Sequence, residues 1–128
     1  MLYIAYSPLA GGFLSGNFTN GNSLAGTRFE EGNPAGNFFK AMYDKPVMHS
    51  ALEDLQVQLE SLGIGAAEAS LRWLCYSSAL GEGDGLILGA SKIEQLKQNH
   101  KAISDGPLPE HAVQAFEKMW KAVKFEAP

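Results

Sequence analysis

The chain has 128 residues, of which 45% are hydrophobic and 19% charged, and this composition excludes a disordered tail. Fourteen acidic residues outnumber ten basic ones, and the net charge of −4 argues against a general nucleic-acid binder. The single cysteine, Cys75, excludes an internal disulfide and a cysteine-based zinc site, and we predict no metal site. No apolar stretch reaches the ~18 residues of a membrane-spanning helix and no signal peptide is visible. We therefore expect a cytoplasmic protein that binds neither membrane nor nucleic acid.

Residues 2–6 are a run of apolar and aromatic side chains directly after Met1. A continuous apolar run of this length predicts a strand that is buried on both faces, as in a parallel sheet. An edge strand and the first turn of a buried helix are the alternatives, and Pro8 disfavours the helix.

A glycine-rich segment, residues 7–17, follows this strand and contains Gly11, Gly12 and Gly16. Glycines allow the backbone to approach a ligand closely, and α/β proteins place ligands at the carboxyl ends of their strands. The glycine content alone favours a tight turn over an anion site.

Residues 18–45 are polar and rich in glycine and asparagine, and we expect a long loop with short helical turns near residues 38–43. Arg28 is the strong anion-pairing group of this stretch. A surface ion pair with Glu30 or Glu31 is the alternative role for Arg28, and it is favoured without further context.

Apolar residues at spacings of three and four predict three further helices, over residues 46–62, 66–80 and about 110–125. Val113, Phe116, Met119, Trp120 and Val123 are expected on the buried face of the last helix. Cys75 is expected to be a small buried hydrophobe, and His49 a solvated residue at a helix start.

Residues 86–88 predict a second buried strand, and residues 93–101 a helix after it. Ser91 is placed to cap this helix, with Glu94 at the spacing of a capping box. The helix dipole and the charge of Lys92 favour an anion here, with Gln95 and Asn99 on the following turns. From these residues alone, a capped helix that binds nothing is equally favoured.

Residues 6–16 and 86–99 together resemble the seventh and eighth β/α units of an aldo-keto reductase, closest to the aflatoxin-aldehyde and succinic semialdehyde reductases. Residues 69–74 and 106–108 also resemble the family, so the resemblance covers essentially the whole chain. It implies an α/β fold: the C-terminal portion of a (β/α)₈ barrel, with about two strands and four or five helices. Residues 1–128 would then form one partial domain, because a complete barrel takes about 250 residues.

The resemblance also implies NADPH (NADP⁺) as cofactor. Arg28 matches an arginine that reaches over the nucleotide. Asn17 stands where the subgroup usually has a lysine, and the chain ends short of the family's C-terminal tail. The remaining implied cofactor residues are Ser7, Leu9, Gly11, Leu14 and Gly16 near the phosphates, and Gly89, Ala90, Ser91, Lys92, Gln95 and Asn99 around the adenosine and its 2′-phosphate.

The family reduces aldehydes and ketones by hydride transfer, and its catalytic Asp, Tyr, Lys and His lie on earlier β/α units that no segment here matches. We therefore nominate no catalytic residue and expect a cofactor-binding part that is inactive alone. One alternative is a non-catalytic, truncated interaction module that self-associates through exposed barrel edges or complements an N-terminal half. Another is a small helical protein whose loops bind an unrelated phosphate ligand.

Overall fold

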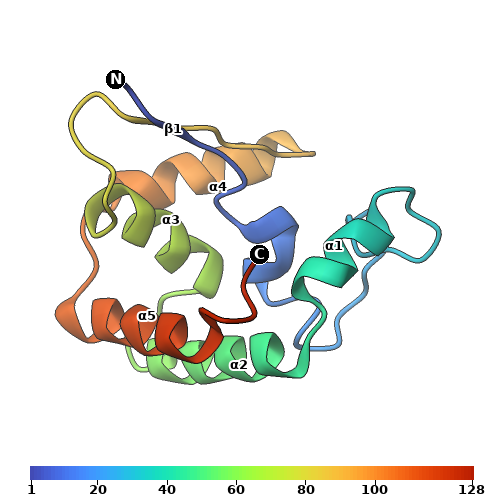
Figure 1. Ribbon diagram of the computed structural model, residues 1–128. Helices are drawn as coiled ribbons and strands as arrows, with labels where there is room; N and C mark the ends of the chain where they lie inside the picture. The colour runs from blue at the N-terminus through green and yellow to red at the C-terminus, as the bar shows by residue number, and fades with distance from the viewer.

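The computed structural model describes residues 1–128 and shows a helix-rich α/β arrangement with two short strands (Figure 1). In chain order the elements are β1 (Ile4–Ala5), the 3₁₀ helix η1 (Ala10–Ser15), α1 (Gly36–Tyr43), α2 (Pro46–Glu60), α3 (Ala66–Tyr76), β2 (Gly85–Leu86), α4 (Ile93–Ser104) and α5 (Glu110–Val123).

The two strands pair in parallel, with Ile4 opposite Gly85 and Ala5 opposite Leu86. The Gly85 N–H donates to the Tyr3 carbonyl at 2.9 Å, and the Ile87 N–H donates to the Ala5 carbonyl at 2.9 Å. The prediction that both strands are buried on both faces is wrong, since Ile4 is 59% exposed and Ile87 56%. A strand is covered on both faces only when helices or a second sheet pack there, and β1 and β2 make their main contacts with each other.

The core lies between η1, α2, α3 and α5 and is centred on α2. Leu52, Leu55 and Leu59 of α2 are fully buried, as the helical spacing predicts. The predicted buried face of α5 is confirmed in part: Val123 is buried, and Val113, Phe116 and Met119 are half-buried against the core. It is wrong for Trp120, which is 56% exposed, and Ala112 and Ala115 are buried instead. Small side chains let α5 approach α2 closely, which leaves the larger apolar residues at the margin of the contact.

The long loop carries more structure than predicted, because α1 spans eight residues at its end. Phe13 of η1 is completely buried and stacks on Tyr43 with 5.7 Å between ring centroids. His49 is not the solvated residue that we expected. Its Nδ1 lies 2.8 Å from Thr19 Oγ1, its Nε2 lies 3.0 Å from Asp44 Oδ1, and its ring packs edge-on against Phe13.

The helix α3 ends at Tyr76, four residues before the predicted end. Cys75 on this helix is only half-buried, although burial is still enough to raise the pKa of its thiol. No helix in the structure combines the length and hydrophobicity needed to cross a bilayer.

Candidate functional site

The segments after β1 and β2 leave the sheet at the same edge, because the strands are parallel. Figure 1 shows η1 and the first turn of α4 both beyond the right-hand end of the strand pair. The structure therefore meets the first requirement of a shared ligand site, which is that both predicted segments lie at the carboxyl ends of the strands.

The first segment, residues 7–16 after β1, is tightly wound, and the backbone at its start has left-handed φ angles. Ala10, Gly11 and Gly12 have successive positive φ angles of 52°, 66° and 100°, and Ser7 has a φ of 53°. Positive φ is unfavourable for Ser7 and Ala10, which lack glycine's freedom. Such strain is concentrated at functional sites in proteins, so the backbone supports a functional role for residues 7–12.

Two of the predicted glycines have positive φ angles and lie against side chains of the chain, the Phe39 ring at Gly11 and the flexible end of Gln56 at Gly16. A Cβ on Gly11 would lie 2.6 Å from Cδ1 of Phe39, and a Cβ on Gly16 would collide with the amide nitrogen of Gln56 on α2. Leu9 and Leu14 are half-buried, and Leu14 packs against the core. These residues fix the shape of the segment, whereas Ser7 and Gly12 remain exposed.

In the second segment, residues 89–99 after β2, the side chain of Gln95 holds the backbone before α4 by hydrogen bonds. Its Oε1 accepts hydrogen bonds from the Ser91 N–H at 3.1 Å, the Ser91 hydroxyl at 3.1 Å and the Lys92 N–H at 3.3 Å. The predicted cap is wrong by one position: Lys92 is the N-cap residue, and Gln95 replaces Glu94 as the partner three residues on. Gln95 bonds here because it is the third residue after the cap, from which its side-chain oxygen reaches both backbone N–H groups that precede the helix.

Several groups of the second segment are still available to a ligand. The first N–H groups of α4 have no partner within the helix. The Lys92 ammonium forms no ion pair, and Gly89 and Ala90 are exposed beside it. Asn99 is half-buried, two turns into α4, and its side chain makes no hydrogen bond within the chain. The segment can therefore bind an anion without losing the contacts of Gln95.

Arg28 does not form the surface ion pair that was its alternative role. Glu30 accepts the Gly26 N–H at 2.9 Å, and neither Glu30 nor Glu31 pairs with Arg28. The guanidinium carbon instead lies 4.9 Å from the centre of the Phe39 ring. Since that ring contacts Gly11, an unpaired cation is brought beside the first segment.

Sequence reasoning missed Phe39, and nothing in the spacing between residues 28 and 39 indicates that the two side chains stack. It also did not place Tyr6 near Tyr43. Burial is the main cause that raises the pKa of Tyr43, and the Tyr6 phenol adds to it. Among the tyrosine hydroxyls, Tyr76 donates to the Ile103 carbonyl at 2.7 Å, and no hydrogen bond joins a tyrosine hydroxyl to a lysine or a histidine.

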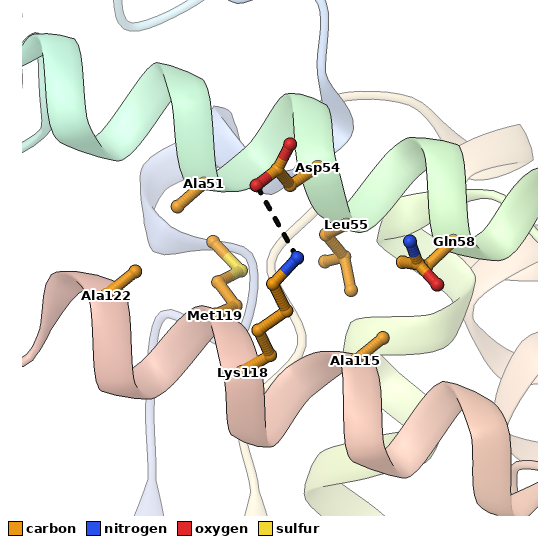
Figure 2. A pocket seen from close by; sticks show the side chains of 8 residues that line it. All are labelled: Ala51, Asp54, Leu55, Gln58, Ala115, Lys118, Met119 and Ala122. Carbon is orange, nitrogen blue, oxygen red and sulfur yellow. Dashed lines mark ion pairs between the residues drawn. The ribbon is translucent and has the colours of Figure 1, made fainter.

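A separate hollow of about 30 Å³ lies between α2 and α5, where Ala51, Ala115 and Ala122 leave space (Figure 2). Lys118 Nζ lies 3.9 Å from Asp54 Oδ2 across its mouth. This volume holds about one water molecule, so the hollow is a packing gap between two helices and not a ligand site.

The amino-acid sequence of the chain is similar to those of several known proteins. The sequence model of the Aldo/keto reductase family matches residues 1–121. The chain is 36% identical to an aldo-keto reductase of Pseudocercospora fijiensis, covering 95% of this chain and 42% of that protein. It is 36% identical to the oxidoreductase sirO of Leptosphaeria maculans (98% and 39% covered) and 35% identical to aflatoxin B1 aldehyde reductase member 2 of Mus musculus (98% and 36% covered).

The chain thus spans about two fifths of the length of the curated relatives it matches. The match covers nearly all of these 128 residues, including both segments at the carboxyl ends of β1 and β2. The chain belongs to the aldo/keto reductase family.

Proposed function

We propose that this chain is the cofactor-binding part of an NADPH-dependent aldo-keto reductase, the C-terminal portion of a (β/α)₈ barrel. The observation that carries the proposal is that each segment after a strand has a basic side chain without an ion-pair partner: Arg28, stacked on Phe39, beside the strained backbone after β1, and Lys92 at the start of α4 after β2. Phosphate groups bind at such places because a helix start and a basic side chain both stabilise negative charge. The names of the relatives, which include an aldehyde reductase and an oxidoreductase, support carbonyl reduction as the reaction.

The two segments would divide the cofactor between them. Residues 7–16 and Arg28 would hold the pyrophosphate, which NADPH and NADH share. Lys92 and the first turn of α4 would hold the 2′-phosphate, which NADPH alone carries. Ser91, Gln95 and Asn99 would contact the adenosine, while Gly89 and Ala90 would let it approach the backbone.

When bound, the nicotinamide would supply the hydride that reduces the carbonyl carbon of a small aldehyde or ketone. The carbonyl oxygen also needs a general acid within hydrogen-bond reach. Because no tyrosine of this chain is paired with a lysine or histidine, we place that acid outside these 128 residues. The chain's own contribution is to bind and orient the cofactor.

The test is a titration of the full 128-residue chain with NADPH and NADH, using Lys92→Ala and Arg28→Ala. We expect tighter binding of NADPH than of NADH. Lys92→Ala should weaken NADPH about fivefold and leave NADH unchanged, while Arg28→Ala should weaken both by a similar factor. Lys97→Ala, which removes the same charge from the same helix away from its start, is the matched control and should change neither.

Equal affinities of the unaltered chain for the two dinucleotides would contradict a 2′-phosphate site and favour an unrelated phosphate ligand. In the same samples, we expect no NADPH-dependent reduction of a simple aldehyde. Measurable turnover would show that a catalytic group lies within this chain.

A second candidate function is an interaction module that pairs with another polypeptide through the sheet. The observation that favours it is the exposure of Leu2, Tyr3, Ile4 and Ile87 on and beside the two strands. Exposed apolar residues along an unpaired strand edge favour association with further strands, either from a second copy or from a separate N-terminal half.

A further inference from the structure

The ring of Phe39 lies where three separate parts of the chain meet. Phe39 belongs to α1, the guanidinium above it comes from the long loop, and Gly11 of η1 lies against its edge. The Phe39 ring thus contacts both Arg28 and the segment after β1. Phe39 is only half-buried, so it is not simply a core residue.

The backbone of Arg28 is held by the residue next to it. Phe29 is 2% exposed and packs edge-on against Phe13, with 6.4 Å between ring centroids. It also packs at a tilted angle against Phe18, with 5.0 Å between ring centroids. Phe29 also contacts Phe39, with centroids 6.3 Å apart at an interplanar angle of 69°. The aromatic cluster therefore fixes where the Arg28 side chain begins and places the Phe39 ring under its end.

The guanidinium itself has no carboxylate partner, so the ring is the group that limits its motion. An arginine side chain has many rotamers, and ordering it costs conformational entropy when a ligand binds. A flat guanidinium over an aromatic face is stabilised by the ring quadrupole and still presents its N–H groups at the edge. A ligand phosphate then meets a donor that is already placed.

We propose that Phe39 is a positioning residue that holds the Arg28 guanidinium beside residues 10–12, ready to pair with the pyrophosphate of a dinucleotide. This inference rests on the proposed function above. It adds that α1, the only helix in the long loop, serves the cofactor site through one aromatic ring.

The test is a double-mutant cycle on the full chain, with Arg28→Ala, Phe39→Leu and the double variant, titrated with NADPH and with NADH. We expect Phe39→Leu to weaken both dinucleotides about threefold, the factor typical of an exposed cation–π contact. In the Arg28→Ala background, Phe39→Leu should have no further effect, because the ring acts through the arginine. Phe39→Tyr, which keeps the ring, should bind like the unaltered chain.

Phe38→Leu is the matched control, since Phe38 is the adjacent aromatic residue of the same helix and packs edge-on against Phe39 at 5.5 Å, whereas the cation–π contact of Arg28 is with Phe39. Phe39→Met, whose flexible side chain fills the same space, replaces Phe39→Leu in the cycle if the leucine variant does not fold.

Two outcomes would overturn the inference while leaving the proposed function intact: normal affinity of the folded Phe39 variants, or equal losses from Phe39→Leu with and without Arg28. A chain that binds neither dinucleotide would overturn the proposed function and this inference with it.

Discussion

Asp84 shows how one half-buried side chain contributes to the strand pair. Its Oδ1 accepts the Tyr3 N–H at 2.9 Å, and its Oδ2 accepts the Gly81 N–H at 2.8 Å. The carboxylate thus closes the turn before β2 and extends the pairing to the residue before β1. These two backbone donors, Gly81 first and Tyr3 second, lower the pKa of Asp84 below its ordinary value of 3.8, against a small opposing effect of burial.

This lowered pKa predicts how stability depends on pH. Because the folded-state pKa lies below the unfolded one, Asp84 stabilises the fold above about pH 3.8, and this stabilisation is lost as the pH falls through the folded pKa. Denaturant unfolding should therefore show Asp84→Asn to be less stable than the unaltered chain at pH 5 to 7, with the difference shrinking below pH 4. Glu82→Gln, in the same turn, should show no such trend. A gap that stays constant across this pH range would contradict the assignment.

Arg72 links α3 to the segment between α4 and α5. Its Nε donates to the Gly106 carbonyl at 2.8 Å, one terminal nitrogen donates to the Pro107 carbonyl at 2.9 Å, and the other donates to Glu68 at 2.9 Å. Only 10% of the side chain is exposed, so these bonds form largely out of water. They fix the connector from which α5 starts and so the direction in which α5 crosses α2.

The prediction for this contact is that Arg72→Met lowers the free energy of unfolding by about 3 kcal/mol, since two carbonyl acceptors lose their buried charged partner. Glu68→Gln, which removes the charge of the pair and keeps an acceptor, should cost less than about 1 kcal/mol. Thermal or denaturant unfolding measures both. Equal losses would mean that the Glu68 ion pair, and not the carbonyl contacts, fixes the connector.

The starts of the helices could be predicted because local signals set them. Pro46 is the first residue of α2, and periodic apolar residues mark its inner face. The buried face of α5 could be predicted only in part from its own periodicity: Val123 is buried as expected, but the close approach of α2 buries Ala112 and Ala115 and leaves Trp120 exposed. The same holds for the strands, whose apolar composition is typical of a buried sheet although the present sheet leaves Ile4 exposed.

For the candidate site, the sequence could predict which segments meet but not how their side chains bond. Parallel pairing follows from two strands that are each followed by helices, and it brings residues 7–16 and 89–95 to one edge. The cap by Gln95 and the stacking of Arg28 on Phe39 depend on side-chain reach across separate segments. No spacing rule contains that information.

At the scale of the whole molecule, burial is limited. Only 20 of the 128 residues are buried, and most of the large apolar side chains left exposed lie on or beside the strand pair and α4. The exposed residues there are Leu2, Tyr3, Ile4, Tyr6, Ile87, Ile93 and Leu96. The relatives are more than twice as long as this chain, which fits a surface that further β/α units would cover.

If copies of the chain associate through this exposed apolar surface, one charged side chain placed in the surface should weaken that association. We expect the full chain to sediment with a concentration-dependent coefficient, and Ile87→Lys to shift it toward the monomer, because a lysine on a strand edge opposes further strand pairing. Val57→Lys is the matched control: Val57 is 61% exposed on α2, close to the 56% of Ile87, but lies away from the sheet. A clean monomer at high concentration would contradict association, and equal effects of the two lysines would show that general surface charge, and not the sheet, controls it.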